Sequence, residues 1–262
     1  GVAPRLAVRV NPDFDLKGSG MKMGGGAKPF GGDADAVPAL VRRLIDAGAD
    51  WQGFHIFAGS QALDASAIAA TQAQTVALAG RLADAIGVAP PLVNLGGGMG
   101  VPYFPGDVAV DVAAVGAALG DTLATRDAAL ADSRFAMELG RWLVAEAGVY
   151  LTRVIDRKAS HGETFLVTDG GLHHQLAASG NFGTVIRRNY PIGVANRFGA
   201  DPEETVSVVA CPLTTLDRLG DQVALPRVQV GDLIVLFLAG AYGATASPAG
   251  FLGQGPAREM LV

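Results

Sequence analysis

The sequence predicts an α/β protein with a parallel sheet over residues 1–150, followed by an antiparallel β domain over residues 151–262. In the first part, apolar strand-like runs alternate four times with Ala-rich amphipathic segments, as in βα units that build a parallel sheet. In the second part, β-branched runs are separated by Gly, Asn and Pro, which is typical of antiparallel strands. The first part is expected to be either a doubly wound sheet or a (β/α)₈ barrel.

Each predicted βα unit joins a strand-like run to the helix that follows it. "RLAVRVNP" precedes a helix expected at residues 37–47, and "WQGFHIFAGS" precedes one at 65–85. "PLVNLGGG" precedes a helix at 108–125, and "RFAMELGR" precedes a short one at 142–148. The strands of the β domain are expected in "YLTRVIDRK", "TFLVTDGG", "TVSVVACPL" and "DLIVLFLAGAY".

The composition excludes several classes of function. The 262 residues carry a net charge of −5 and only 17% charged side chains, without the basic stripe that nucleic acids or anionic membranes require. The apolar runs are too short and too often interrupted by Gly to span a bilayer, so we expect no membrane partner and a cytoplasmic location. The single cysteine, Cys211, excludes an internal disulfide and is either a small buried hydrophobe or a reactive thiol.

Polar and glycine residues gather where the predicted parallel strands end. Backbone N–H groups of a glycine run, a serine hydroxyl and a guanidinium are all donors to a phosphate, whereas a simple turn is the alternative for the glycines. Glu138 would be repelled by a phosphate unless it serves another part of the ligand, such as a protonated pyridine nitrogen. The strand-end residues are Arg9, Asn11, His55, Ser60, Gly96, Gly97, Gly98, Glu138 and Arg141.

Five motifs, in order and over nearly the whole chain, carry a family resemblance: "GFHIFAGSQ", "NLGGGMGVPYF", "MELGR", "VTDGGLHHQL" and "AGAY". They resemble the fold type III pyridoxal-phosphate decarboxylases, such as diaminopimelate and ornithine decarboxylases. "GSGMKMGGGAKPFG", "NFGTVIRRNYPIGVANR" and "GATASPAGFLG" are similar to a bacterial subgroup associated with exosortase gene clusters. The resemblance implies pyridoxal 5'-phosphate as cofactor, an amino-acid substrate, a homodimer with shared active sites, and a (β/α)₈ barrel followed by a β domain.

The resemblance also implies roles for single residues. It places Ser60, Gly96, Gly97, Gly98, Arg141 and Tyr242 at the cofactor phosphate. Glu138 would pair with the pyridine nitrogen and favour its protonated form, which makes the ring an electron sink. Racemases that share the barrel place an arginine there instead. Arg9 matches a family arginine near the cofactor, with a strand-end salt bridge as the alternative.

Two residues depart from the family pattern. Phe57 stands where the family has a histidine stacked on the cofactor ring, and an aromatic ring can still stack. His55, two residues earlier and therefore on the same face of a strand, is a catalytic candidate through a polar contact or else a core histidine. The family's catalytic cysteine lies four residues before an aspartate, whereas Leu213 holds that place before Asp217 and Cys211 lies two residues too early. Cys211 is therefore either the catalytic acid or an inert thiol.

Candidate substrate-binding residues are Arg187 and Arg188, which suit a substrate carboxylate, and Asp169. Solvated surface arginines are the alternative for the first two. A metal site at Asp169, His173 and His174 is not expected, because adjacent histidines on a strand point to opposite faces.

The lysine that binds pyridoxal phosphate covalently in this family lies on an early barrel strand. None of Lys17, Lys22, Lys28 and Lys158 matches it, and the sequence starts abruptly without Met. We expect the chain to hold the C-terminal half of the barrel and the β domain of a decarboxylase. A non-catalytic homologue acting as a dimerisation or regulatory module is the alternative, and an unrelated phosphate-binding barrel would leave Glu138 and "AGAY" unexplained.

Overall fold

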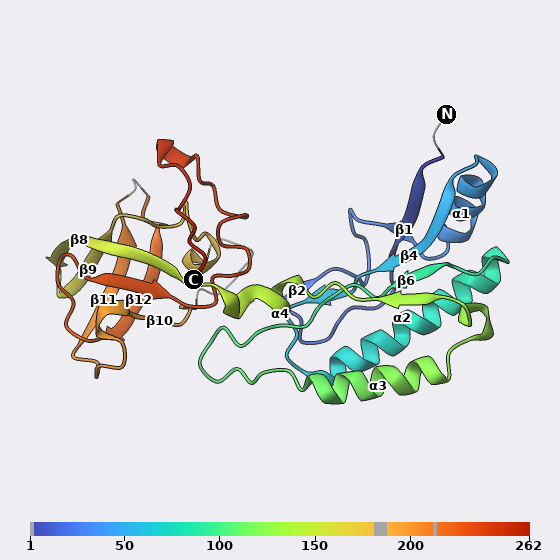
Figure 1. Ribbon diagram of the computed structural model, residues 1–262, viewed down its shortest axis with the longest axis horizontal. Helices are drawn as coiled ribbons and strands as arrows, with labels where there is room; N and C mark the ends of the chain where they lie inside the picture. The colour runs from blue at the N-terminus through green and yellow to red at the C-terminus, as the bar shows by residue number, and fades with distance from the viewer. Residues whose placement is uncertain (1–2, 181–187, 212–213) are drawn as a thin grey trace. The chain divides into compact units, whose positions relative to one another are not determined.

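The computed structural model describes residues 3–180, 188–211 and 214–262 (Figure 1). These residues form two compact units. The first comprises residues 3–102 and 108–140, and the second comprises residues 103–107 with the described part of 141–262. The predicted domain boundary at residue 150 stays a prediction.

The first unit is built on a parallel sheet in the strand order β3-β1-β4-β6-β7. Its strands are β1 (Arg5–Asn11), β3 (Gly32–Asp33), β4 (Asp50–Ile56), β6 (Leu92–Asn94) and β7 (Arg134–Ala136). The leading strands of the four βα units lie side by side in chain order. The short strand β3, which follows β1 in the chain, pairs with the other edge of β1. A short antiparallel pair, β2 (Met21–Lys22) and β5 (Gly59–Ser60), lies beside it.

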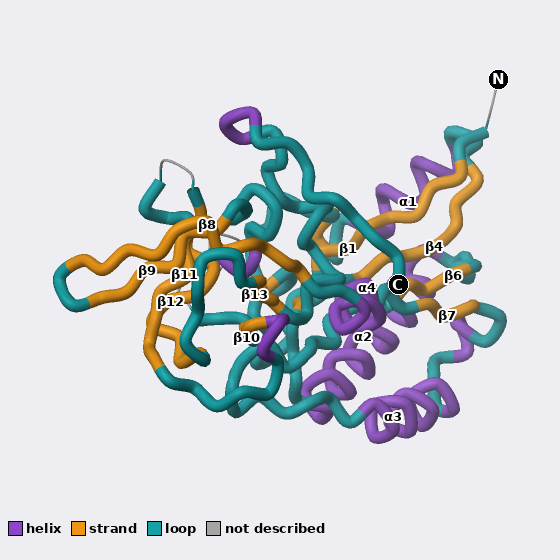
Figure 2. The backbone as a smooth tube through the Cα atoms, turned by 60° about the vertical axis from the view of Figure 1, so that its left-hand side comes forward, coloured by secondary structure: helices purple, strands orange, loops and turns teal. Residues whose placement is uncertain are grey.

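The helices of the four units are α1 (Val37–Asp46), α2 (Ala65–Ile86), α3 (Val112–Ala124) and α4 (Gly140–Val144). The helix α2 packs against both α1 and α3. Figure 2 shows α3 beside α2. Alternate strand residues, among them Val10, Ile56 and Val93, are buried in one core with apolar side chains of α1 and α2. This burial leaves the opposite face of the same strands to polar residues.

Helix α3 begins four residues later than expected. The Asp111 carboxylate accepts a hydrogen bond from the Ala114 N–H at 2.9 Å, which makes Asp111 the N-cap and leaves residues 108–110 outside the helix. No helix of the described residues is both long and apolar enough to cross a membrane.

The second unit contains a six-stranded sheet in the order β10-β13-β8-β9-β11-β12. Its strands are β8 (Tyr150–Ser160), β9 (Glu163–Thr168), β10 (Ile192–Val194), β11 (Glu204–Ala210), β12 (Arg218–Leu225) and β13 (Leu233–Leu236). The expectation of a wholly antiparallel domain is wrong, because β9 and β11 pair in parallel. The long connection over residues 169–203 allows this, since a parallel pair needs a crossover of a dozen residues or more.

Short 3-10 turns punctuate both units at Ala128–Leu130, Ala145–Ala147, Ala177–Ser179, Ala195–Arg197 and Phe251–Gly253. The core of the second unit lies on the sheet, where Leu166, Val206, Leu219, Ile234 and Leu236 have no accessible side-chain surface.

Candidate active site

A row of polar side chains crosses the parallel sheet on the face opposite the helices. Arg9 of β1 is in register with His55 of β4, and His55 is in register with Asn94 of β6. Asn94 is in register with Ala136 of β7, and Glu138 follows two residues later, so its side chain emerges on the same face. Three strands and the end of a fourth therefore place these side chains together.

Glu138 is held at both carboxylate oxygens. Its Oε2 lies 3.1 Å from His55 Nε2, and its Oε1 accepts a hydrogen bond from Asn94 Nδ2 at 2.9 Å. The Asn94 Oδ1 in turn accepts from the Gly96 N–H at 2.9 Å, which ties this group to the glycine run. The side chain of Glu138 is 57% exposed, so the oriented carboxylate remains open to a ligand.

The Arg9 guanidinium lies near two aromatic rings. Its central carbon is 5.2 Å from the centre of the Phe30 ring and 5.8 Å from that of Phe57. The buried Nη2 of Arg9 has no hydrogen-bond acceptor among the described residues. A buried cationic donor without an acceptor is costly, so this nitrogen suits an anionic or carbonyl oxygen of a ligand.

The glycine run is explained first by the close approach of neighbouring chain segments. A Cβ on Gly97 would lie 2.0 Å from the Glu138 carbonyl oxygen, and a Cβ on Gly98 would lie 2.8 Å from that of Gly59. The Gly96 carbonyl accepts from the Glu138 N–H at 2.8 Å. Gly97 is partly exposed and Gly98 is buried, and the N–H groups of both have no acceptor within the described part of the chain, which makes them candidate donors to an anion.

Ser60 lies in β5, on the segment that flanks the glycine run. The Ala62 N–H donates to the Gly98 carbonyl at 2.9 Å, and the Gly100 N–H donates to the Ala62 carbonyl at 2.8 Å. The structure therefore brings the serine segment and the glycine segment together, as the strand-end pattern predicts.

In the second unit, Arg141 and Tyr242 lie together. The Arg141 guanidinium is 4.6 Å from the centre of the Tyr242 ring, and its Nη1 donates to the Tyr103 hydroxyl at 3.0 Å. The ring centres of Tyr103 and Tyr190 are 4.5 Å apart, and burial raises the pKa of Tyr190 above its usual value, with Tyr103 contributing. Tyr103 and Tyr190 were missed by the sequence analysis, although each stands next to a singled-out motif, in "VPYF" and "RRNY".

The predicted substrate residues have different surroundings. The Arg188 guanidinium lies 4.0 Å from the centre of the Phe104 ring and 3.7 Å from an Asp107 oxygen, so it is not a freely solvated side chain. Asp169 is exposed, but its Oδ1 accepts from the Thr152 hydroxyl and the Arg153 N–H, both at 2.8 Å. Arg187 lies outside the described residues.

Cys211 is exposed and follows the end of β11. Its N–H donates to the Thr168 carbonyl at 3.1 Å, which fixes the backbone but not the thiol. Of the two alternatives for this cysteine, the small buried hydrophobe is therefore wrong, and its role as an acid stays a prediction.

The adjacent residues His173 and His174 have different surroundings. His174 is bonded at both ring nitrogens, to the Tyr150 hydroxyl at 3.0 Å and the Gly255 carbonyl at 3.1 Å. His173 is 2% exposed, and neither of its ring nitrogens has a partner among the described residues. Within the described residues no group of three His, Cys, Asp or Glu side chains is arranged to hold a metal ion.

The burial of His173 predicts a pH dependence of stability. Burial, with a smaller contribution from His174, lowers the pKa of His173, so the unfolded chain binds the proton more readily. The contribution of His173 to the free energy of unfolding should therefore be constant above about pH 6.5 and fall as the pH is lowered below this value. Denaturant titrations should show that His173→Leu reduces this fall, whereas substitution of exposed His161 by Asn does not. An equal fall in His173→Leu would contradict this assignment.

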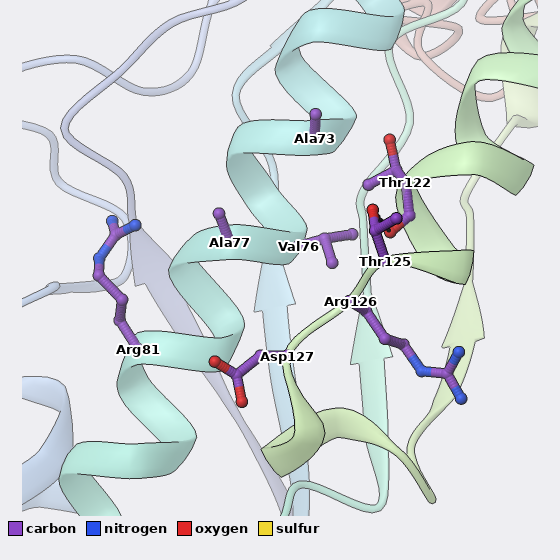
Figure 3. A pocket seen from close by; sticks show the side chains of 8 residues that line it. All are labelled: Ala73, Val76, Ala77, Arg81, Thr122, Thr125, Arg126 and Asp127. Carbon is purple, nitrogen blue, oxygen red and sulfur yellow. Dashed lines mark hydrogen bonds between the residues drawn. The ribbon is translucent and has the colours of Figure 1, made fainter.

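A pocket of about 500 Å³ lies elsewhere in the first unit, between α2, α3 and the turn after α3 (Figure 3). Arg126 at this turn donates to the carbonyls of Leu123, Leu130 and Ala131, and therefore serves to join the ends of neighbouring elements. None of the predicted site residues lines this pocket.

Comparisons with known proteins show the family to which the chain belongs. Residues 2–145 match the family model "Pyridoxal-dependent decarboxylase, pyridoxal binding domain", and residues 108–240 match "Pyridoxal-dependent decarboxylase, C-terminal sheet domain". The chain is 38% identical to L-glutamyl-[BtrI acyl-carrier protein] decarboxylase of Niallia circulans, over 98% of this chain and 61% of that protein. It is 32% identical to diaminopimelate decarboxylase of Archaeoglobus fulgidus, over 100% of this chain and 61% of that protein.

Solved structures show the same fold. Diaminopimelate decarboxylase from Helicobacter pylori complexed with L-lysine superposes with a TM-score of 0.77 at 24% identity, over 94% of this chain and 59% of that one. Lysine/ornithine decarboxylase from Vibrio vulnificus complexed with cadaverine has a TM-score of 0.74 at 17% identity, over 97% of this chain and 61% of that one. The chain thus spans about three fifths of the length of these relatives. On the two family models, it belongs to the pyridoxal-dependent decarboxylase family, whose cofactor is pyridoxal phosphate.

Proposed function

We propose that the protein containing this chain is a pyridoxal-phosphate-dependent carboxy-lyase that acts on an amino acid. The observation that carries the proposal is the Glu138 carboxylate, fixed by His55 and Asn94 beside a glycine run at the ends of parallel strands. In this proposal the first unit is the C-terminal half of a (β/α)₈ barrel, supported by its strand order and its likeness to the solved decarboxylases.

The described residues fit the cofactor. The free N–H groups of Gly97 and Gly98 suit its phosphate, and the unpartnered Nη2 of Arg9 suits an anionic oxygen. Ser60, Arg141 and Tyr242 stay predicted phosphate ligands. When bound, pyridoxal phosphate supplies an electron sink for the electron pair left behind as the carboxyl group departs.

The chain's own residues tune this chemistry. The negative Glu138 carboxylate favours a proton on a pyridine nitrogen placed against it, because an opposite charge stabilises the charged form. His55 and Asn94 are positioning residues, since each holds one carboxylate oxygen. Phe57 would present an apolar ring face to the cofactor and would exclude water there. Unlike a histidine, it has no ring proton to exchange.

The remaining assignments belong to the proposal. Arg187, Arg188 and Asp169 would contact the substrate, and Cys211 would be an acid delivered across a homodimer with shared active sites. An amino-acid substrate of the diaminopimelate or ornithine type is supported by the names of the relatives, one of which acts on a glutamyl group borne by an acyl-carrier protein. Membership of the exosortase-associated subgroup and a cytoplasmic location stay predictions.

Carbon dioxide release from a panel of substrates tests the proposal. With pyridoxal phosphate present, we expect release from at least one of meso-diaminopimelate, L-ornithine, L-lysine and carrier-bound L-glutamate. Cofactor binding without release from any of them would favour the non-catalytic alternative, a dimerisation or regulatory module. Absence of cofactor binding would contradict both.

A further inference from the structure

The second unit contains a pocket of about 310 Å³, and Tyr242 is its one lining residue that the proposed function uses. Its walls include backbone of Gly148, Gly240 and Gly243 and the side chains of Tyr150 and His174. A Cβ on Gly148 would lie 2.8 Å from the Gly240 Cα, so these glycines bring two chain segments close together. The C-terminal segment over residues 257–260 completes the lining.

Gln175 is the unexplained group in this pocket. It is 1% exposed, and neither its Nε2 nor its Oε1 has a hydrogen-bond partner among the described residues. A buried amide with neither bond made is costly and rare in native proteins. A Cβ on Gly243 would lie 2.5 Å from Gln175 Oε1, so the glycine leaves the space that the amide occupies. Both ring nitrogens of neighbouring His174 are already bonded.

The polar groups, charges and volume of the pocket indicate which kind of ligand it can hold. An amide side chain offers one donor and one acceptor side by side, which matches the acceptor and donor of a secondary amide. Arg258 and Glu259 line the pocket, are both exposed and carry opposite charges, so the lining favours neither an anion nor a cation. The volume corresponds to about ten water-sized groups, enough for a short stretch of extended chain.

We propose that this pocket binds a neutral extended chain through a secondary amide paired with Gln175. The Gln175 Nε2 donates to the carbonyl of the ligand, and the N–H of the ligand donates to Gln175 Oε1. Tyr242 is the one lining residue that also belongs to the predicted cofactor set, whereas Gln175, which makes the pairing, is outside that set. The amide can come from an amide-bearing arm of a substrate or from a polypeptide backbone.

Calorimetric titration of the protein without cofactor tests the inference with two probes, pantetheine and N-acetylglycine N-methylamide. We expect at least one to bind saturably, and the analogue of that probe with ester oxygen in place of amide N–H to bind about tenfold more weakly, equivalent to about 1.4 kcal/mol. Binding of pantetheine alone indicates that the natural ligand is the amide-bearing arm of a substrate. Binding of the peptide probe indicates that the natural ligand is a polypeptide segment. Absence of saturable binding by both, or equal binding of ester and amide, would overturn the site.

Variants separate the site from a structural role. Gln175→Leu should weaken binding about tenfold without lowering the Tm of the free protein, because it removes two unpaired polar atoms at similar volume. Gly243→Ala should weaken binding as well, since its Cβ takes the place of the amide. The matched control is Gln72→Leu, a buried glutamine of α2 in the first unit, which should leave affinity unchanged. Unchanged affinity in Gln175→Leu, or a lowered Tm, would contradict the proposal.

Discussion

Replacement of Gly97 by alanine is expected to destabilise the protein by about 2 kcal/mol or more and to abolish cofactor binding. The new Cβ would lie 2.0 Å from the Glu138 carbonyl oxygen and 3.1 Å from the Glu138 carbonyl carbon. The segments that contain Gly97 and Glu138 cannot move apart without a cost in free energy, because the Glu138 N–H donates to the Gly96 carbonyl at 2.8 Å. Relief of the clash must therefore move the carboxylate that faces the ligand. Denaturant titration and equilibrium dialysis with pyridoxal phosphate measure the two effects.

The matched control is Gly116→Ala on α3. Apart from its chain neighbours and the backbone of its own helix, no atom lies within 4 Å of the position of its Cβ, so the new methyl group causes no clash. Because alanine forms helices better than glycine, this variant should be more stable by roughly 0.5–1 kcal/mol and should bind the cofactor normally. If Gly97→Ala were as stable as the parent protein, the close approach of the two strand ends would be wrong.

Substitution of Glu138 by glutamine is expected to lower kcat about 100-fold or more, while the fold is retained. Glutamine keeps the shape of the side chain and can still accept from Asn94 Nδ2, but it removes the negative charge that favours a protonated ring nitrogen. Each unit by which the pKa of that nitrogen falls corresponds to about 1.4 kcal/mol. The rate of carbon dioxide release at saturating substrate and cofactor measures the loss.

Glu146→Gln is the control for this substitution, since Glu146 is an exposed carboxylate in the turn after α4. It should leave kcat unchanged. A Glu138→Gln protein with the activity of the parent would show that the carboxylate serves the fold alone, and the proposed function would lose the observation on which it rests.

The parallel sheet and its four βα units could be predicted from the sequence because each unit carries its own local signal. The apolar run of β6 and the Ala-rich α2, capped by Asp64 and ended by Gly87 in the left-handed region, are examples. The parallel pairing of β9 with β11 could not be predicted in this way. The alternation of side chains along a strand does not record its direction, which the connection between the strands decides.

The candidate site was predicted in part. His55 and Glu138 were identified as strand-end polar residues, and the structure joins them. Asn94 was missed as a site residue because a single asparagine inside an apolar run gives no sign of its partner. The register of β4, β6 and β7 alone shows that it lies beside Glu138. The glycine run was expected to bind an anion, whereas the structure shows that close approach of backbone also requires it at Gly97.

The most direct test of the central claim compares the affinity of the protein for pyridoxal phosphate with that for its analogue with carbon in place of the ring nitrogen. If Glu138 faces that nitrogen, the analogue should bind about tenfold to 100-fold more weakly, as expected for loss of a hydrogen bond to a charged group. The difference should largely disappear in Glu138→Gln. Equal affinities of the parent protein for the two compounds would contradict the account.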